Sequence, residues 1–212
     1  MTIRSNNTRT LCELAPIIPV LVVHDVAHAI PLAQALVRGG LPVLEVTLRT
    51  PAALDVIAAM ATVEGGYVGA GTLITPDDIH AAKAAGATFG VSPGATDLLL
   101  DMCEAADLPL LPGAATASEA MRLLERGYDM LKFFPAEASG GVDALKGIGA
   151  PLPQISFCPT GGVNPKNAPS YLALSNVVCA GGSWVAPSDL VNAGKWDEIE
   201  ALARVASTLG RG

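Results

Sequence analysis

Aromatic side chains and cations are scarce in this chain of 212 residues. Phe, Trp and Tyr make up 4% of it, and 13 Lys and Arg face 20 Asp and Glu, which gives a formal net charge of −7. Proteins that bind nucleic acids cluster their cations and stack aromatic rings on bases, and anionic membranes attract polybasic segments. The composition therefore argues against nucleic-acid and membrane partners.

Long apolar runs and metal-binding motifs are also missing. The polar amino-terminal segment leads into no signal-peptide core, and proline and glycine break the longest charge-free stretch, 167–188. Four cysteines form no CxxC pair, and no HExxH motif occurs, so we expect reduced thiols, a cytoplasmic location and no metal. His24-Asp25-Val26 follows the first predicted strand where a dinucleotide fold would need a glycine-rich turn. We therefore expect no cofactor.

Half of the residues are apolar, and they fall in short runs separated by helical patterns. Eight runs are apolar throughout rather than alternating, which is typical of strands covered on both faces. They are 17–23, 43–48, 67–71, 88–92, 108–111, 130–134, 155–158 and 177–180. Short strand–helix connections predict parallel strands with right-handed crossovers. Eight units predict a single (β/α)8 TIM barrel over residues 1–212; a doubly wound open sheet is the alternative.

Several helix boundaries carry a sequence signal. Thr50-Pro51, Thr75-Pro76 and Asn164-Pro165 each place a capping residue before a proline, which favours a helix start. Residues 1–16 form an amino-terminal segment, in which 11–15 is a candidate short helix closing the floor of the barrel.

Lys132 stands out because it lies inside an apolar strand pattern. One interpretation is structural: the lysine reaches the surface or pairs with a carboxylate. The other is catalytic, since a desolvated amine can lose its proton, attack a ketone and form a Schiff base. Polar or glycine-rich residues also follow six other predicted strands, and active sites of barrels lie at that end, which favours the catalytic interpretation.

Glu45 and Arg49 lie in and just after the second predicted strand. A carboxylate among apolar residues needs a partner, so Glu45 is either a structural ion-pair partner of Arg49 or Lys132, or a general acid/base, or both. The guanidinium of Arg49 suits a substrate carboxylate, although packing in a loop is the alternative.

Two glycine pairs follow the seventh and eighth predicted strands. Gly161-Gly162 and Gly181-Gly182-Ser183 stand where barrels frequently bind phosphate with backbone N–H groups. One such pair is a weak signal because ordinary turns need glycine, but two pairs after these two strands favour an anion site.

Six segments together resemble the 2-keto-3-deoxy-6-phosphogluconate (KDPG) and 4-hydroxy-2-oxoglutarate (KHG) aldolase family. They are EVTLRT (45–50), GAGT (69–72), SPG (92–94), KFFPAE (132–137), CPTGG (158–162) and GGSW (181–184). The resemblance covers about residues 17–204. It implies a metal-independent Schiff-base aldolase on a TIM barrel, a phosphorylated keto-acid substrate and a cytoplasmic homotrimer.

The resemblance also implies roles for individual residues. Lys132 is similar to the Schiff-base lysine and Glu45 to the general acid/base. The other matching positions are Arg49, Thr72 and Pro93 around the substrate carboxylate, Phe134 and Thr160 in the pocket, and Gly161, Gly162, Gly182 and Ser183 at the hydroxyl and phosphate groups. Thr160 favours the gluconate substrate over its galactonate epimer.

Three alternatives stay open. The first is a phosphogalactonate-specific aldolase of the same family. The second is a phosphosugar isomerase that uses Glu45 as a base beside an unreacted Lys132. The third is a non-catalytic barrel that binds phosphorylated metabolites, in which Lys132 and Glu45 stay permanently paired. Fold alone does not separate these possibilities.

Overall fold

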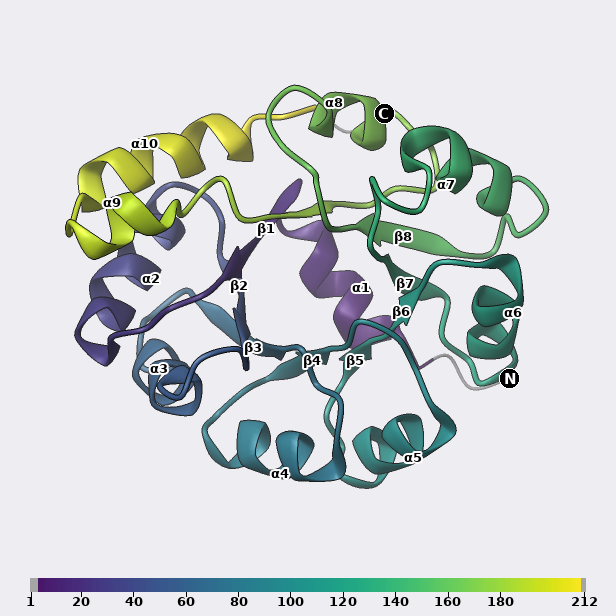
Figure 1. Cartoon of the computed structure of the whole chain (residues 1–212), viewed down its shortest axis with the longest axis horizontal. Helices are drawn as coiled ribbons and strands as arrows, with labels where there is room; N and C mark the ends of the chain where they lie inside the picture. The colour runs from purple at the N-terminus through teal and green to yellow at the C-terminus, as the bar shows by residue number, and fades with distance from the viewer. Residues whose placement is uncertain (1–3, 211–212) are drawn as a thin grey trace.

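The computed structural model describes residues 4–210 and places a ring of parallel strands inside a ring of helices (Figure 1). Residues 1–3 and 211–212 of the predicted 1–212 domain lie outside the described residues. The strands are β1 Ile17–Leu21, β2 Val43–Thr47, β3 Tyr67–Gly71, β4 Phe89–Val91, β5 Leu110–Leu111, β6 Gly113–Ala114, β7 Met130–Phe133, β8 Ser156–Pro159 and β9 Ala180–Gly182. The helices are α1 Asn6–Glu13, η1 Val26–His28, α2 Ala29–Arg38, α3 Ala53–Met60, α4 Pro76–Ala84, α5 Asp97–Ala105, α6 Ala117–Glu125, α7 Gly141–Gly149, α8 Ala168–Leu172, α9 Ser188–Asn192 and α10 Trp196–Ser207.

The strand order closes a barrel with eight positions. One sheet has the order β5-β4-β3-β2-β1-β9 and the other the order β6-β7-β8, and every registered pair is parallel. Bridges from Phe157 to Val177 and from Thr160 to Gly181 join β8 to the chain leading into and through β9. At the other junction only Pro112 separates β5 from β6, so these two segments share one position. The predicted TIM barrel is confirmed.

Side chains alternate between the inside of the barrel and the helix layer, as the period of a strand requires. On β2, Leu44 and Val46 belong to the core that includes the helices, whereas Val43 belongs to a separate cluster with Met130 and Cys158. Glu45 shares the parity of Val43, and Lys132 shares that of Met130 on β7. Both charged groups therefore face the inside of the barrel.

Helix α1 covers one end of the barrel and crosses its centre in Figure 1. Cys12 packs into the inner cluster with Ile18, Val43 and Phe89, which lie at the amino ends of their strands. The Ser5 hydroxyl accepts hydrogen bonds from the N–H groups of Asp129 and Met130, at 3.0 and 3.2 Å. The predicted helix over the floor is present, but it spans Asn6–Glu13 rather than 11–15.

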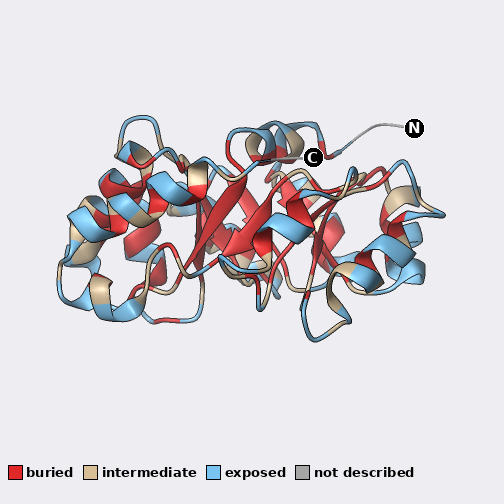
Figure 2. Ribbon diagram, turned by 90° about the horizontal axis from the view of Figure 1, so that it is seen from above, coloured by how far each residue is buried: buried red, intermediate tan, exposed pale blue. Residues whose placement is uncertain are grey.

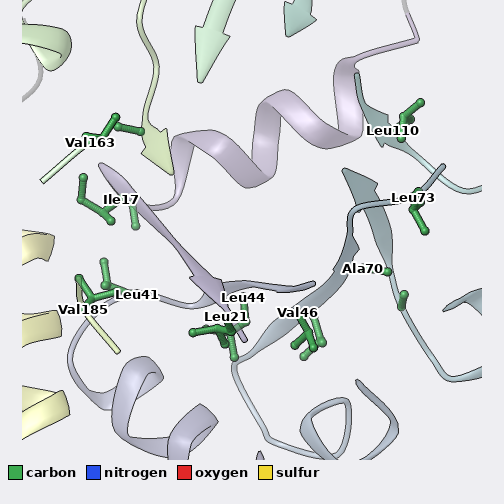
Figure 3. Close-up of a cluster of buried hydrophobic side chains, with 14 of the residues drawn as sticks. Ile17, Leu21, Leu41, Leu44, Val46, Ala70, Leu73, Leu110, Val163 and Val185 are labelled. Carbon is green, nitrogen blue, oxygen red and sulfur yellow. The ribbon is translucent and has the colours of Figure 1, made fainter. Parts of the chain in front are cut away.

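The surrounding helices bury their inner faces against the strands, and their outer faces are exposed (Figure 2). Figure 3 shows part of this layer, where Leu21, Leu44 and Val46 project from adjacent strands. The ring closes where α10 meets α2: a Cβ on Gly39 would lie 2.4 Å from Cβ of Ala203. Within residues 4–210, no helix is both long and apolar enough to cross a membrane.

One of the three predicted helix starts is confirmed. The Thr75 hydroxyl accepts from the N–H of Asp78, whose carboxylate accepts from the N–H of Thr75, and α4 starts there. The prediction at Thr50-Pro51 is wrong, because the Thr50 hydroxyl donates to the Val23 carbonyl at 2.7 Å and α3 begins only at Ala53. Asn164-Pro165 forms a turn, and α8 begins three residues later than Pro165.

Candidate active site

Lys132 and Glu45 form an ion pair inside the barrel. Lys132 Nζ donates to Glu45 Oε1 at 3.1 Å, and the two side chains are 6% and 4% exposed. They come from β7 and β2, which stand on different sides of the ring in Figure 1, so their meeting depends on closure of the barrel. Isolated buried charges are costly, and each of these charges has the other as its partner.

Glycine provides the space for this pair. A Cβ on Gly71 would lie 2.4 Å from Glu45 Oε1, so the Glu45 side chain occupies the place of a missing side chain on β3. On the other side, Lys132 Nζ lies 5.3 Å from the centroid of the Phe134 ring, in cation–π range. The ammonium group is thus held between a carboxylate and an aromatic face.

Arg49 and Thr72 meet at the carboxyl ends of β2 and β3. Arg49 Nε donates to Thr72 Oγ1 at 3.3 Å. Thr72 has φ 66°, a conformation that β-branched residues rarely adopt and that is often found at functional sites. Pro93 lies further along the same end: a Cβ on Gly113 would come within 2.3 Å of its carbonyl oxygen.

A cavity of about 320 Å³ opens at this end of the barrel. Its lining residues are Val20, Val22, Arg49, Phe134, Thr160, Gly161, Gly162, Val163, Gly181, Ser183 and Ser188. Six of these have a role that the family resemblance implies, and Gly181 belongs to the second glycine pair selected from the sequence. The lining contains Gly181 rather than the predicted Gly182, whose Cα is covered by the ring of Trp184. Thr160 is 6% exposed and connects the cavity to the buried layer below.

The backbone after β8 has its carbonyl groups engaged by protein donors. Three successive carbonyls are occupied by protein donors: Thr160 O by the N–H of Ala136, Gly161 O by the N–H of Glu137, and Gly162 O by the side-chain amides of Asn164 and Asn167. Within residues 4–210 no protein acceptor takes the N–H of Gly162 or Val163, both of which line the cavity. Gly161 and Gly162 have φ values of 98° and 82°. Free N–H groups in a loop of this kind are able to bind an anion.

The sequence interpretation gave no role to Glu137 or Tyr171. The Tyr171 hydroxyl donates to Glu137 Oε1, and the Glu137 side chain packs on Gly162, since a Cβ there would lie 2.6 Å from Glu137 Cγ. The KFFPAE motif contains Glu137, but no local pattern links it to a tyrosine 34 residues away. Within the described chain no three His, Cys, Asp or Glu side chains gather as a group able to hold a metal ion.

A family model described as KDPG and KHG aldolase matches residues 8–202 of this chain. The chain belongs to this aldolase family. A protein of Pseudoalteromonas atlantica named 2-dehydro-3-deoxy-phosphogluconate aldolase is 56% identical over 192 residues, which is 90% of this chain and 89% of that protein. The family assignment rests on similarity across nearly the whole barrel.

Two solved structures of family members have the same fold. The KDPG aldolase of Zymomonas mobilis ZM4, determined with 3-phosphoglycerate, superimposes with a TM-score of 0.93 at 47% identity and covers 98% of both chains. The KDPG aldolase of Legionella pneumophila, with pyruvate captured as a covalent carbinolamine, gives a TM-score of 0.92 at 45% identity and covers 94% of this chain and 98% of that one. Both similarities extend over nearly the whole chain.

Proposed function

We propose that this chain is a class I aldolase that cleaves KDPG to pyruvate and glyceraldehyde 3-phosphate, and that it also cleaves KHG to pyruvate and glyoxylate. The single observation that carries the proposal is the buried contact of 3.1 Å between Lys132 Nζ and Glu45 Oε1 beneath a cavity lined by Gly161 and Gly162. A nucleophilic amine, a proton carrier and an anion site are the parts that this reaction needs.

Lys132 supplies covalent catalysis. Its neutral amine attacks C2 of the keto acid, and loss of water from the carbinolamine leaves an iminium. The Legionella pneumophila relative, captured with pyruvate as a carbinolamine, supports this first step. The iminium then accepts the electron pair of the C3–C4 bond, which converts a difficult carbanion into an enamine.

Glu45 moves the protons. It takes a proton from Lys132 before attack and returns one to the carbinolamine hydroxyl as water leaves. It next takes the proton of the C4 hydroxyl, so that the C3–C4 bond breaks and the aldehyde departs. Protonation of the enamine at C3 and hydrolysis of the resulting iminium release pyruvate and free Lys132. One carboxylate within hydrogen-bond reach of the amine serves all these transfers.

The two ends of the substrate bind different parts of the mouth. We assign the carboxylate to Arg49 and Thr72, with Pro93 at that wall, and the apolar face beside the imine to Phe134. We assign the phosphate to Gly161, Gly162, Gly182 and Ser183. The N–H groups that have no protein acceptor support this assignment, and phosphate binding far from the reacting bond orients the substrate.

Thr160 carries the preference for the gluconate substrate. Its hydroxyl lies at the boundary between the cavity and the Lys132 layer, 3.9 Å from Cys158 Sγ. We expect Thr160→Val to lower kcat/KM for KDPG about tenfold relative to the galactonate epimer, because one hydroxyl contact is lost. A ratio unchanged from that of the wild type would contradict this role.

The direct test of the function is a turnover assay of the purified chain with KDPG, KHG and the galactonate epimer. Pyruvate is measured through NADH consumption by lactate dehydrogenase. Lys132→Arg, which retains a cation beside Glu45, is expected to abolish turnover, and the matched exposed variant Lys146→Arg is expected to retain it. Turnover of none of the three substrates by the wild type would overturn the proposal.

We also propose that residues 1–212 form one catalytic unit that works in the cytoplasm as a homotrimer. Apolar side chains such as Leu98 on α5 and Met121 on α6 are 60% and 51% exposed, which leaves apolar surface for a subunit contact. Light scattering after size-exclusion chromatography is expected to give three times the chain mass of 21.5 kDa. A monomer mass at micromolar concentration would contradict it.

A further inference from the structure

Glu137 lies immediately beside the loop that we assign to phosphate. Its N–H donates to the Gly161 carbonyl at 3.0 Å. Its Cβ and Cγ would lie 2.7 and 2.6 Å from a Cβ on Gly162, so its side chain packs directly on the Cα of that glycine. Any movement of Glu137 therefore changes where Gly161 and Gly162 stand.

Tyr171 fixes the position of this carboxylate. Tyr171 lies on α8, its side chain is fully buried, and its hydroxyl donates to Glu137 Oε1. Burial and the Glu137 carboxylate raise the pKa of the Tyr171 hydroxyl, so it stays protonated and able to donate over the whole neutral range. Gly141 adjoins the contact, since a Cβ there would lie 3.5 Å from Glu137 Oε1 and 3.6 Å from the Tyr171 hydroxyl, at ordinary van der Waals distance from both.

The opposite side of the loop is held by side-chain amides. Asn164 Nδ2 and Asn167 Nδ2 both donate to Gly162 O at 3.1 Å, and Asn167 Oδ1 accepts from the N–H of Asn164 at 2.7 Å. With its carbonyl fixed in this way, Gly162 is confined on one face by two asparagines and on another by Glu137.

We propose that Glu137 and Tyr171 are a positioning pair that holds the Gly161–Gly162 backbone in its anion-binding conformation and so sets affinity for the phosphate end of the substrate. The pair does not touch the reacting atoms. The negative charge of Glu137 disfavours an anion nearby, so its place beside the loop indicates a geometric function rather than a direct contact with phosphate. The hydrogen bond from the buried Tyr171 hydroxyl holds the carboxylate in that place. This inference rests on the proposed aldolase function.

Two matched acceptors, glyceraldehyde 3-phosphate and glyceraldehyde, distinguish an effect on phosphate binding from a general effect on the active site. Both condense with the enamine of pyruvate, and only the first carries a phosphate. We expect Tyr171→Phe and Glu137→Ala to raise KM for glyceraldehyde 3-phosphate about tenfold or more, because hydrogen bonds to a charged group are misaligned. The kinetic constants for glyceraldehyde are expected to stay within about twofold of the wild type.

Three further variants test rescue by a conservative substitution and provide controls at remote exposed positions. Glu137→Gln keeps an oxygen that accepts from Tyr171 and is expected to restore most of the phosphate preference. Glu64→Ala and Tyr67→Phe, both exposed near the amino end of β3, serve as matched controls with no expected effect. Thermal unfolding of every variant shows whether the barrel stays folded.

The outcomes are distinguishable. Loss restricted to the phosphorylated acceptor, with rescue by glutamine, supports the proposal. Equal loss for both acceptors, no loss for either, or a glutamine variant as weak as the alanine variant overturns it. Borohydride trapping of pyruvate on each variant tests the chemistry of Lys132 separately, so failure of trapping in the wild type would indicate failure of the aldolase function instead.

Discussion

Glu45 Oε1 stands 2.4 Å from the position that a Cβ on Gly71 would occupy. The carboxylate beside Lys132 therefore depends on the absence of a side chain on the neighbouring strand. Real Cβ atoms do not approach an oxygen this closely, so even a methyl group at position 71 must displace the carboxylate.

Gly71→Ala is accordingly expected to lower kcat for KDPG cleavage at least about hundredfold, because proton transfer needs hydrogen-bond reach between base and substrate. The variant should remain folded, since Gly71 does not have a positive φ. Steady-state kinetics and thermal unfolding measure both quantities. Gly147→Ala is the matched control, because a Cβ there meets nothing within 4 Å. Full activity in Gly71→Ala would contradict the placement of Glu45.

Removing one member of the buried ion pair should destabilise the barrel. Lys132→Met leaves the Glu45 carboxylate without its partner, and we expect the free energy of unfolding at neutral pH to fall by about 3 kcal/mol. The double variant Lys132→Met/Glu45→Gln should recover most of this loss, because no buried charge remains. Urea denaturation measures the cycle, with Lys146→Met as an exposed control. Additive single and double effects would show that the two groups do not interact.

Ser5 ties the amino-terminal helix to β7. Its hydroxyl is fully buried and accepts from two backbone N–H groups, those of Asp129 and Met130. Ser5→Ala leaves both donors without an acceptor, so we expect a loss of about 2 kcal/mol in the free energy of unfolding. Ser118→Ala, at an exposed position on α6, should change it by less than about 0.5 kcal/mol. Equal stabilities of the two variants would show that Ser5 does not hold α1 in place.

Cys103 makes the free energy of unfolding depend on pH in the alkaline range. Burial, with a smaller effect of Glu104, raises the pKa of this thiol from 9.0 to about 11. Between these values the unfolded chain loses the thiol proton and the folded chain keeps it. The folded state therefore binds more protons, and its stability falls as pH rises from 9 toward 11.

Denaturation series across this pH range should show a shallower fall for Cys103→Ala than for the wild type. One thiol contributes at most about 1.4 kcal/mol per pH unit to the difference in slope. At pH values below 9 the two proteins should differ only by a constant amount. Parallel curves up to pH 11 would contradict burial of Cys103.

The barrel itself was predictable because its signals are local and repeated. Apolar runs of strand length, each followed by a helical pattern, locate seven of the eight strand positions well. The eighth run, 177–180, overlaps β9 at Ala180 only, because β9 continues into the glycines. The break between β5 and β6 at Pro112 was not predicted. Proline has no N–H to donate to the strand ladder, but its carbonyl still accepts from the N–H of Lys132 at 2.9 Å, so the apolar run continues through the break. The helix start predicted at Thr50 failed because the Thr50 hydroxyl donates to the Val23 carbonyl, after the neighbouring strand β1, instead of capping a helix. Tertiary hydrogen bonds of this kind leave no local pattern.

The site residues that could be predicted from the sequence are those in or directly after the strands. Lys132 and Glu45 stood out because each is a charged residue inside an apolar strand pattern. That both face the inside of the barrel was not predictable, because these strands are apolar on both faces and the sequence does not distinguish the two. The pairing of Glu137 with Tyr171 depends instead on how α8 packs under the loop after β8. That contact joins residues from different βα units, so no spacing in the chain could have indicated it.

Incubation with pyruvate and borohydride, followed by peptide mass spectrometry, shows whether Lys132 forms an imine with the substrate. Borohydride reduces an imine to a stable secondary amine, so a class I aldolase keeps one pyruvyl group on its reactive lysine. We expect a single adduct on Lys132 that is absent from Lys132→Met and retained in Lys146→Met. No adduct, or adducts spread over the exposed lysines, would contradict a Schiff-base mechanism at this site.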